Sequence, residues 1–235
     1  MTAPRRDRND PAQYDDLAGE WWRPDGAFAA LHWLAASRAG HIPRAAHADA
    51  VLVDLACGAG LMAPYVARLG YRHVGVDLGT TGLRLARTHG VLPVRGSVLA
   101  VPLADGCADV VVAGEILEHV EDDVAVLAEC ARLLRRGGTV VLDALPDTRL
   151  SVLLNVHVLE RLPGGPPRRL HDPRLFVDRA RLLAAADRLG LDLRLVGLRP
   201  SIPEVIAWNL GRRDMVTMKP MRWTGWVFAG YGTKR

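Results

Sequence analysis

VLVDLACGAG, the stretch at residues 51–60, decides the fold of this chain. It begins with a short apolar, β-branched run, which predicts a buried strand. A Gly-Ala-Gly turn follows, and the next residues, 61–69, have the apolar spacing of a helix that packs on a sheet. Glycines at such a corner let a ligand approach the backbone closely, and the start of the helix offers free N–H donors. The stretch therefore predicts a strand–turn–helix unit that binds a ligand at its turn.

Two acidic residues indicate which ligand this is. Residues 58–63 fit the G-x-G-x-x-A fingerprint of dinucleotide-binding folds, but ribose is common to NAD and S-adenosylmethionine. Asp77 ends a second apolar strand, where its carboxylate can accept hydrogen bonds from both ribose hydroxyls. Asp54 precedes the glycines, where its charge would repel a pyrophosphate but suits the ammonium group of S-adenosylmethionine. The two acids together favour S-adenosylmethionine over NAD.

Strand and helix patterns alternate along most of the chain. Besides the strand that begins at Val51, strands are predicted at residues 74–77, 92–95, 108–113, 139–145, 191–198 and 226–231. Helices are predicted between them, at about 61–69, 80–88, 122–134 and 179–189. This alternation predicts an α/β, Rossmann-like fold, with a seven-stranded, mostly parallel sheet and helices on both faces. Ligands bind such sheets at the carboxyl ends of the strands.

Three other regions do not follow the alternation. Residues 1–12 are predicted to be a disordered tail and residues 13–48 a helical cap that contains Trp21 and Trp22, ahead of a main domain at 49–235. The cap either covers one edge of the sheet or closes over the cofactor. A helix and loop at about 147–176 are predicted to form an insertion that covers the methyl acceptor. Residues 200–222 are predicted to be irregular, and their Met and Trp side chains fit an adaptable apolar wall or an ordinary core.

Composition and charge narrow the class of protein. A chain of 235 residues with 49% hydrophobic residues suits one soluble α/β domain. The net charge of +4 comes from scattered arginines without an interleaved aromatic stripe, so no nucleic-acid partner is expected. Cysteines at positions 57, 107 and 130 lack metal-ligand spacing and suit a reducing cytoplasm. Neither a signal peptide nor an apolar run of about 20 residues is recognised, so a cytoplasmic location is expected.

Several motifs resemble those of one enzyme class. The first motif D-x-x-C-G-x-G and the corner GEILEHV at residues 114–120 resemble class I S-adenosylmethionine-dependent methyltransferases. Trp21-Trp22 and His171-Asp172 resemble a narrower group, the ubiquinone-biosynthesis O-methyltransferases, which methylate catechol-type hydroxyls of polyprenyl phenols. The resemblance covers most of residues 14–198. It implies O-methylation of a phenolic small molecule, either a ubiquinone-like precursor or a secondary metabolite, with peripheral membrane contact if the acceptor is a prenyl lipid.

The motifs and the resemblance also imply particular site residues. Those expected to bind the cofactor are Arg38, Asp54, Ala56, Gly58, Gly60, Asp77, Leu78, Ser97 and Gly114. Those implied as ligands of a divalent metal are Glu115, Glu118 and His119, which would share one face at the start of a helix. Carboxylates suit Mg²⁺, and the imidazole widens the choice to Zn²⁺ or Mn²⁺. Alternatively, Glu118 and His119 cap the helix and pair with Arg38 or a backbone carbonyl.

Methyl transfer to a hydroxyl also needs a group that removes the proton. The transfer is an in-line displacement, in which alignment supplies most of the catalysis. Deprotonation of the acceptor calls for a base or a metal, and His119 and then His171 are the candidate bases. A metal-free N- or C-methyltransferase and a non-catalytic S-adenosylmethionine-binding protein remain alternatives.

Three departures from the family pattern bear on the acceptor. Glu20 stands where the family usually has Arg, and Arg169-Leu170 stand where it tends to have Gly-Thr. Gly96-Ser97 follow the third strand, where many members of the class place an acid against the adenine amine. These departures leave the cofactor prediction intact and weaken the assignment of the acceptor.

Overall fold

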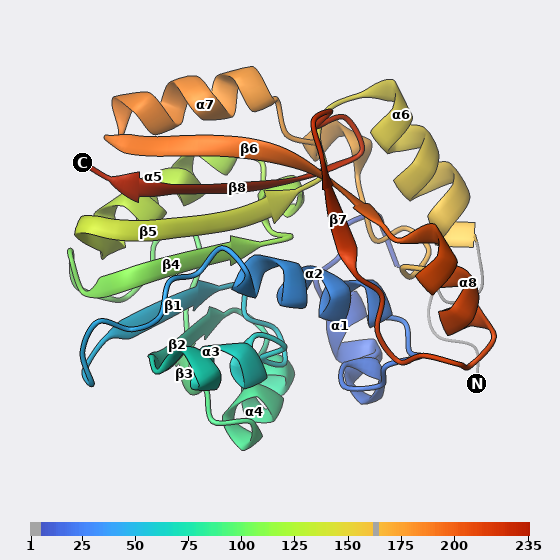
Figure 1. Ribbon diagram of the computed structural model, residues 1–235, viewed down its shortest axis with the longest axis horizontal. Helices are drawn as coiled ribbons and strands as arrows, with labels where there is room; N and C mark the ends of the chain where they lie inside the picture. The colour runs from blue at the N-terminus through green and yellow to red at the C-terminus, as the bar shows by residue number, and fades with distance from the viewer. Residues whose placement is uncertain (1–5, 162–164) are drawn as a thin grey trace.

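A sheet of eight strands runs through the molecule, in the order β3-β2-β1-β4-β5-β8-β6-β7 (Figure 1). The computed structural model describes residues 6–161 and 165–235. The strands are β1 (Val51–Leu55), β2 (Arg72–Asp77), β3 (Leu92–Arg95), β4 (Ala108–Gly114), β5 (Leu134–Ala144), β6 (Leu191–Pro200), β7 (Met218–Met221) and β8 (Val227–Lys234). β3, β2, β1, β4 and β5 pair in parallel, and β8 runs antiparallel between β5 and β6. The predicted Rossmann-like fold is confirmed, with one strand more than the predicted seven.

The additional strand, β7, lies in the segment that was predicted to be irregular. β6 continues to Pro200, beyond its predicted end, and its last four residues pair with β7 in antiparallel register. Pro220 is tolerated because β7 is an edge strand, where a missing N–H costs no ladder hydrogen bond. The sequence Met-Lys-Pro-Met has no apolar alternation, so only its partner β6 defines it as a strand.

The helices pack on both faces of the sheet, as predicted. The α-helices are α1 (Ala12–Asp16), α2 (Ala29–Ala39), α3 (Ala63–Leu69), α4 (Thr80–Thr88), α5 (Asp123–Leu133), α6 (Arg149–Ser151), α7 (Arg179–Arg188) and α8 (Ile202–Asn209). Shorter turns are the 3₁₀-helices η1 (Ala18–Glu20), η2 (Leu117–His119), η4 (Leu159–Arg161) and η5 (Pro173–Leu175), and a π-helix, η3 (Val152–Val158). Asp178 caps α7 by accepting hydrogen bonds from the amides of Ala180 and Arg181. Among the described residues, none of the helices is long and apolar enough to cross a membrane.

Strand β4 shows how the sheet separates two cores. Val111 and Ala113 pack into the core beneath α5 and α7, whereas Val110 and Val112 pack on the opposite face with Phe28 of the N-terminal region. Successive strand residues point to opposite faces, so a strand buried on both faces is continuously apolar. The apolar run of β4 from Val110 to Ala113 fits this burial on both faces.

The N-terminal region differs from the prediction of a disordered tail. Residues 6–12 are described and make defined contacts, whereas residues 1–5 lie outside the described residues. The backbone N–H of Asn9 donates to the carbonyl of Arg169 at 3.1 Å, and the Arg8 guanidinium forms an ion pair with Glu160. The segment contains little apolar surface, so polar contacts hold it in place. Figure 1 shows α1, α6 and α8 at the end of the sheet where β4 and β5 finish.

Candidate active site

The turn after β1 has the backbone conformation that its glycines allow. Gly58 and Gly60 have φ angles of 50° and 79°, in the left-handed region that favours glycine. Ala56 also lies there, with φ 55°. A Cβ atom at Gly58 would lie 2.5 Å from the Trp21 ring, so this glycine also makes room for the cap. The backbone conformation of this turn therefore allows a ligand to approach the main chain closely.

Asp77 ties this turn to the loop that follows β2. One carboxylate oxygen accepts a hydrogen bond from the amide of Gly58 at 2.9 Å, and the other accepts from the amide of Gly79 at 2.7 Å. Burial raises the pKa of Asp77. Each carboxylate oxygen has a further lone pair, so the side chain can still accept from ribose hydroxyls. The structure thus brings together Asp77 and Gly58, two of the residues expected to bind the cofactor.

Replacing Asp77 by alanine is expected to weaken S-adenosylmethionine binding by about 1–3 kcal/mol, because two ribose hydroxyls lose their acceptor. The change also frees the amides of Gly58 and Gly79, which shape the turn. Isothermal titration calorimetry measures the affinity, and circular dichroism verifies the fold. The matched control is Asp192→Ala, an exposed acid on β6. Unchanged affinity in a folded Asp77→Ala protein would exclude the assignment.

Arg38 contacts both Gly114 and a residue that was not predicted, Asp143. Arg38 Nη1 lies 3.0 Å from Oδ1 of Asp143, and the two side chains are 7% and 0% exposed. A Cβ atom at Gly114 would lie 1.3 Å from Arg38 Nη1, so the guanidinium occupies the space above this glycine. Sequence reasoning missed Asp143, although an acid near the carboxyl end of an otherwise apolar strand was a signal for it.

Three other residues were predicted to bind the cofactor, and their surroundings in the structure differ. Asp54 is buried, with Oδ2 3.2 Å from Nε2 of His73 on β2. Leu78 follows Asp77 and is 59% exposed. The hydroxyl of Ser97 accepts a hydrogen bond from the amide of Leu99. The cofactor contacts of Asp54, Leu78 and Ser97 stay predictions.

The two tryptophans of the cap contact the turn directly. Trp21 stacks on Phe28 with ring centroids 4.3 Å apart and lies against Gly58. Trp22 donates its indole N–H to the carbonyl of Ala59 at 3.1 Å and stacks on His89. The cap therefore rests on the predicted cofactor turn.

S-adenosylmethionine is expected to change the fluorescence of these tryptophans and the hydrogen exchange of residues 14–34, because a ligand at the turn must displace or order the cap. Trp22→Phe should remove most of the fluorescence response. The control is Trp223→Phe, a half-exposed tryptophan elsewhere, which should keep it. If saturating cofactor alters neither signal, the segment is a static cover of the sheet edge.

The corner after β4 holds a half-buried acid, Glu115, and a fully buried one, Glu118. Glu115 has φ 51°, a left-handed conformation that is rare outside glycine, and its amide donates to Asp143. Glu118 is fully buried, and neither carboxylate oxygen has a hydrogen-bond partner in the described chain. Burial raises the pKa of Glu118 to about 8, and burial together with the nearby charge of Glu118 raises that of Glu115. Glu118 is therefore largely protonated near neutral pH, and the pKa of Glu115 is shifted in the same direction.

His119 does not join these acids in a metal site. Its Nδ1 lies 2.5 Å from Oδ1 of Asn9, and its Nε2 lies 3.4 Å from the hydroxyl of Tyr14. Across residues 6–161 and 165–235, no three His, Cys, Asp or Glu side chains are placed to hold a metal ion.

The metal site predicted at Glu115, Glu118 and His119 is therefore not supported by the structure. That prediction assumed α-helical spacing from Glu115 onward. Instead, Glu115 is left-handed and only residues 117–119 form a 3₁₀ turn, so the three side chains do not share a face. Arg38 is the cation nearest the acids and lowers the pKa of Glu115 and Glu118 in part, but it pairs with Asp143.

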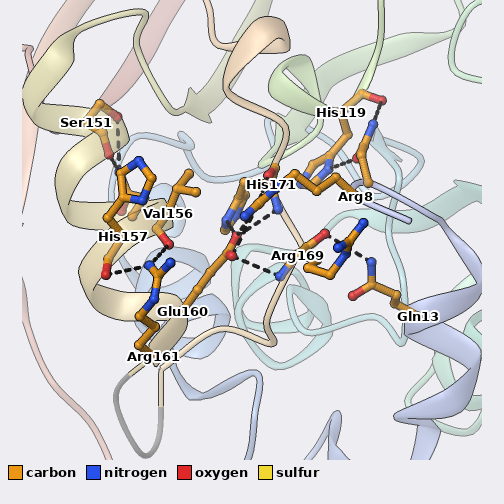
Figure 2. A network of polar contacts seen from close by, with 12 residues as sticks. Arg8, Gln13, His119, Ser151, Val156, His157, Glu160, Arg161, Arg169 and His171 are labelled. Carbon is orange, nitrogen blue, oxygen red and sulfur yellow. Dashed lines mark hydrogen bonds and ion pairs between the residues drawn. The ribbon is translucent and has the colours of Figure 1, made fainter. Parts of the chain in front are cut away.

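The structure does bring the two candidate bases together. The rings of His119 and His171 lie 5.6 Å apart, and Figure 2 shows both beside Arg8. Nδ1 of His171 lies 3.3 Å from Oε1 of Glu160. Burial, and secondarily the charge of His171, lowers the pKa of His119 to about 3, so its ring is neutral at physiological pH. Sequence reasoning missed Glu160, an acid near the end of an apolar stretch.

Tyr14 shows how close the cofactor turn and the bases are. Its pKa is raised mainly by burial, and then by the charges of Glu118, Glu115 and Asp77. The same hydroxyl contacts Nε2 of His119. The Tyr14 hydroxyl thus lies beside a neutral imidazole, a group that can accept a proton from a hydroxyl.

Comparisons with known proteins agree with this geometry. The family described as methyltransferase domain matches residues 53–142. "Ubiquinone biosynthesis O-methyltransferase" of Cupriavidus pinatubonensis is 34% identical over 200 residues, covering 82% of this chain and 80% of that protein. The protein of the same name from Idiomarina loihiensis is 33% identical over 204 residues, covering 82% and 83%.

Solved structures show the same fold at lower identity. A SAM-dependent methyltransferase from Thermotoga maritima superposes with a TM-score of 0.65 and 17% identity, covering 95% of this chain and 97% of that one. Another from Archaeoglobus fulgidus gives a TM-score of 0.63 and 16% identity, with coverage of 94% and 100%. At such identities the likeness concerns the fold alone.

Proposed function

Since the chain belongs to the family of ubiquinone biosynthesis O-methyltransferases and is an S-adenosylmethionine-dependent methyltransferase, we propose that it methylates a hydroxyl of a phenolic or catechol-type small molecule. The acceptor is a ubiquinone-like precursor or a related secondary metabolite. A prenylated acceptor would bring the enzyme to a membrane surface. The free thiols of Cys57, Cys107 and Cys130 are those expected in a reducing cytoplasm, where we place the enzyme.

The residues present fit S-adenosylmethionine. Asp77 retains lone pairs for the ribose, and the turn at Gly58 allows close approach. Asp54, which precedes the glycine turn, is a buried acid. A carboxylate at this position suits a positively charged ligand and would repel the pyrophosphate of NAD. When bound, S-adenosylmethionine supplies an electrophilic methyl group and leaves as S-adenosylhomocysteine.

The observation that carries the phenolic acceptor is the contact of His119 with Tyr14. The phenol hydroxyl of this tyrosine lies 3.4 Å from Nε2, so a phenol already sits against the proposed base. A phenolic acceptor that takes this position presents the same group to the same nitrogen. Nε2 of His119 accepts the hydroxyl proton while the oxygen lone pair forms the bond to the methyl carbon.

An acceptor screen tests the proposal. The protein is incubated with S-adenosylmethionine and with catechols, prenylated catechols, simple phenols and amines of similar size. We expect mass spectrometry to show that a methyl group replaces hydrogen on a phenolic oxygen, together with S-adenosylhomocysteine. Methylation of amines alone would favour an N-methyltransferase. Cofactor binding without S-adenosylhomocysteine for every acceptor would favour a binding protein.

A further inference from the structure

Asn9 holds His119 at two points. Its side-chain Nδ2 donates to the backbone carbonyl of His119 at 2.9 Å, and its Oδ1 lies 2.5 Å from Nδ1 of the same histidine. The two residues are 110 positions apart in the chain. One amide group therefore clamps both the main chain and the ring of the candidate base.

These two contacts determine which ring nitrogen carries the proton. A carbonyl oxygen only accepts hydrogen bonds, so the Asn9 atom next to it must be the NH₂ group. The other amide atom is then oxygen, which also only accepts, so Nδ1 of His119 must be the donor. A neutral imidazole has a single N–H, which leaves Nε2 unprotonated, with its lone pair available to the Tyr14 hydroxyl at 3.4 Å or to an acceptor hydroxyl in its place. The low pKa of His119 is consistent with this neutral form.

Asn9 is itself held in place. Its backbone N–H donates to the carbonyl of Arg169, and the neighbouring Arg8 guanidinium donates to the carbonyl of His171 at 2.6 Å. Arg8 also contacts the buried carboxylate of Glu160 (Figure 2). Asn9 has φ 60°, a conformation that asparagine tolerates better than most residues. These contacts fix the amide before any substrate arrives.

We propose that Asn9 is a positioning residue that fixes His119 in the Nδ1–H tautomer and so turns the lone pair of Nε2 toward the acceptor hydroxyl. The role in turnover rests on the proposed function, whereas the tautomer does not. Orientation of a catalytic imidazole by an acceptor on its other nitrogen is a known requirement, because the wrong tautomer cannot take the proton. A segment outside the methyltransferase core thereby completes the acceptor side of the site.

Two substitutions at Asn9 test whether it orients the His119 ring or only anchors the N-terminal segment. Asn9→Gly removes the side chain without strain, because glycine adopts positive φ freely. Asn9→Asp keeps an oxygen that accepts from Nδ1 and tolerates the same backbone conformation. The matched control is Asp7→Ala, an exposed residue of the same segment. The wild type and these three variants are all used as full-length proteins, and their folds are compared by circular dichroism.

The first measurement is the nitrogen-15 spectrum of the His119 ring at neutral pH without ligand, assigned by comparison with His119→Gln. We expect a protonated Nδ1 and a bare Nε2 in the wild type, in Asp7→Ala and in Asn9→Asp. In Asn9→Gly the Nε2–H tautomer should become populated. An unchanged ring spectrum in Asn9→Gly, or an Nε2–H tautomer in the wild type, would overturn the proposal.

The second measurement is turnover with an acceptor from the screen. Asn9→Gly should lower kcat by about tenfold or more while the KM for S-adenosylmethionine stays nearly constant, and Asn9→Asp should recover most of the loss. A changed tautomer with unchanged kcat would overturn the positioning role. If no acceptor is methylated by any of the four proteins while the tautomer still depends on Asn9, the proposed function fails and the assignment of the tautomer stands.

Discussion

Replacing Arg38 by methionine is expected to lower the free energy of unfolding by about 3–5 kcal/mol, the usual cost of leaving one partner of a buried ion pair alone. Methionine fills much of the volume but leaves Asp143, which is 0% exposed, without its cation. The loss also raises the pKa of Glu115 and Glu118 further, because the charge of Arg38 lowers both. Urea unfolding at neutral pH measures the change.

Two further proteins make that test specific. Arg136→Met removes an exposed arginine after α5 and should change the unfolding free energy by less than about 0.5 kcal/mol. The double variant Arg38→Met with Asp143→Leu should regain much of the lost stability, since two apolar groups leave no buried charge unpaired. Equal unfolding curves for wild type and Arg38→Met would show that the ion pair does not stabilise the fold.

Glu118→Gln is expected to flatten the dependence of stability on pH. The pKa of Glu118 is about 8 in the folded protein, against 4.5 ordinarily. Below pH 4.5 both folded and unfolded forms are protonated, and the neutral buried form carries no penalty. As the pH rises from 4.5 toward 8, Glu118 ionises only in the unfolded form, so the free energy of unfolding falls. The contribution of Glu118 to stability is fully lost once the pH exceeds its pKa in the folded protein. By pH 7 this loss amounts to roughly 3 kcal/mol.

Glutamine has nearly the same shape as protonated glutamate and does not titrate. The difference in unfolding free energy between Glu118→Gln and wild type should therefore grow by roughly 3 kcal/mol between pH 4.5 and pH 7. Denaturant unfolding at several pH values measures it, and Glu121→Gln, at an exposed neighbour, is the control. Parallel pH profiles for wild type and Glu118→Gln would contradict the assignment of a protonated buried acid.

The fold was largely predictable because local patterns carry it. The glycine turn after β1 and the apolar strands require only short-range spacing, and α4 lies at the predicted residues. Strand β7 could not be predicted, because its pairing is set by β6 rather than by its own residues. The pairing of Asp77 with Gly58 was predictable, since adjacent parallel strands end at one edge of the sheet.

The acceptor side was harder to predict for two physical reasons. At the corner after β4, the left-handed Glu115 breaks the helical spacing that the sequence indicated. Asn9 and Arg8 act through a few polar contacts to residues more than a hundred positions away. Such contacts leave no periodic pattern, so a polar segment that is held in place looks the same in sequence as one that is not.

The place of β8 in the sheet has a consequence for synthesis of the protein. β5 and β6 are joined only through β8, which is the last of the eight strands to be made. On the ribosome, a nascent chain that stops before Val227 has unpaired backbone groups along one edge of each of these strands, a template for aggregation. Strands β1 to β5, with the glycine turn, can pair before β8 is made, whereas β6 and β7 join the sheet only through β8. Completion of the eight-stranded sheet therefore requires β8.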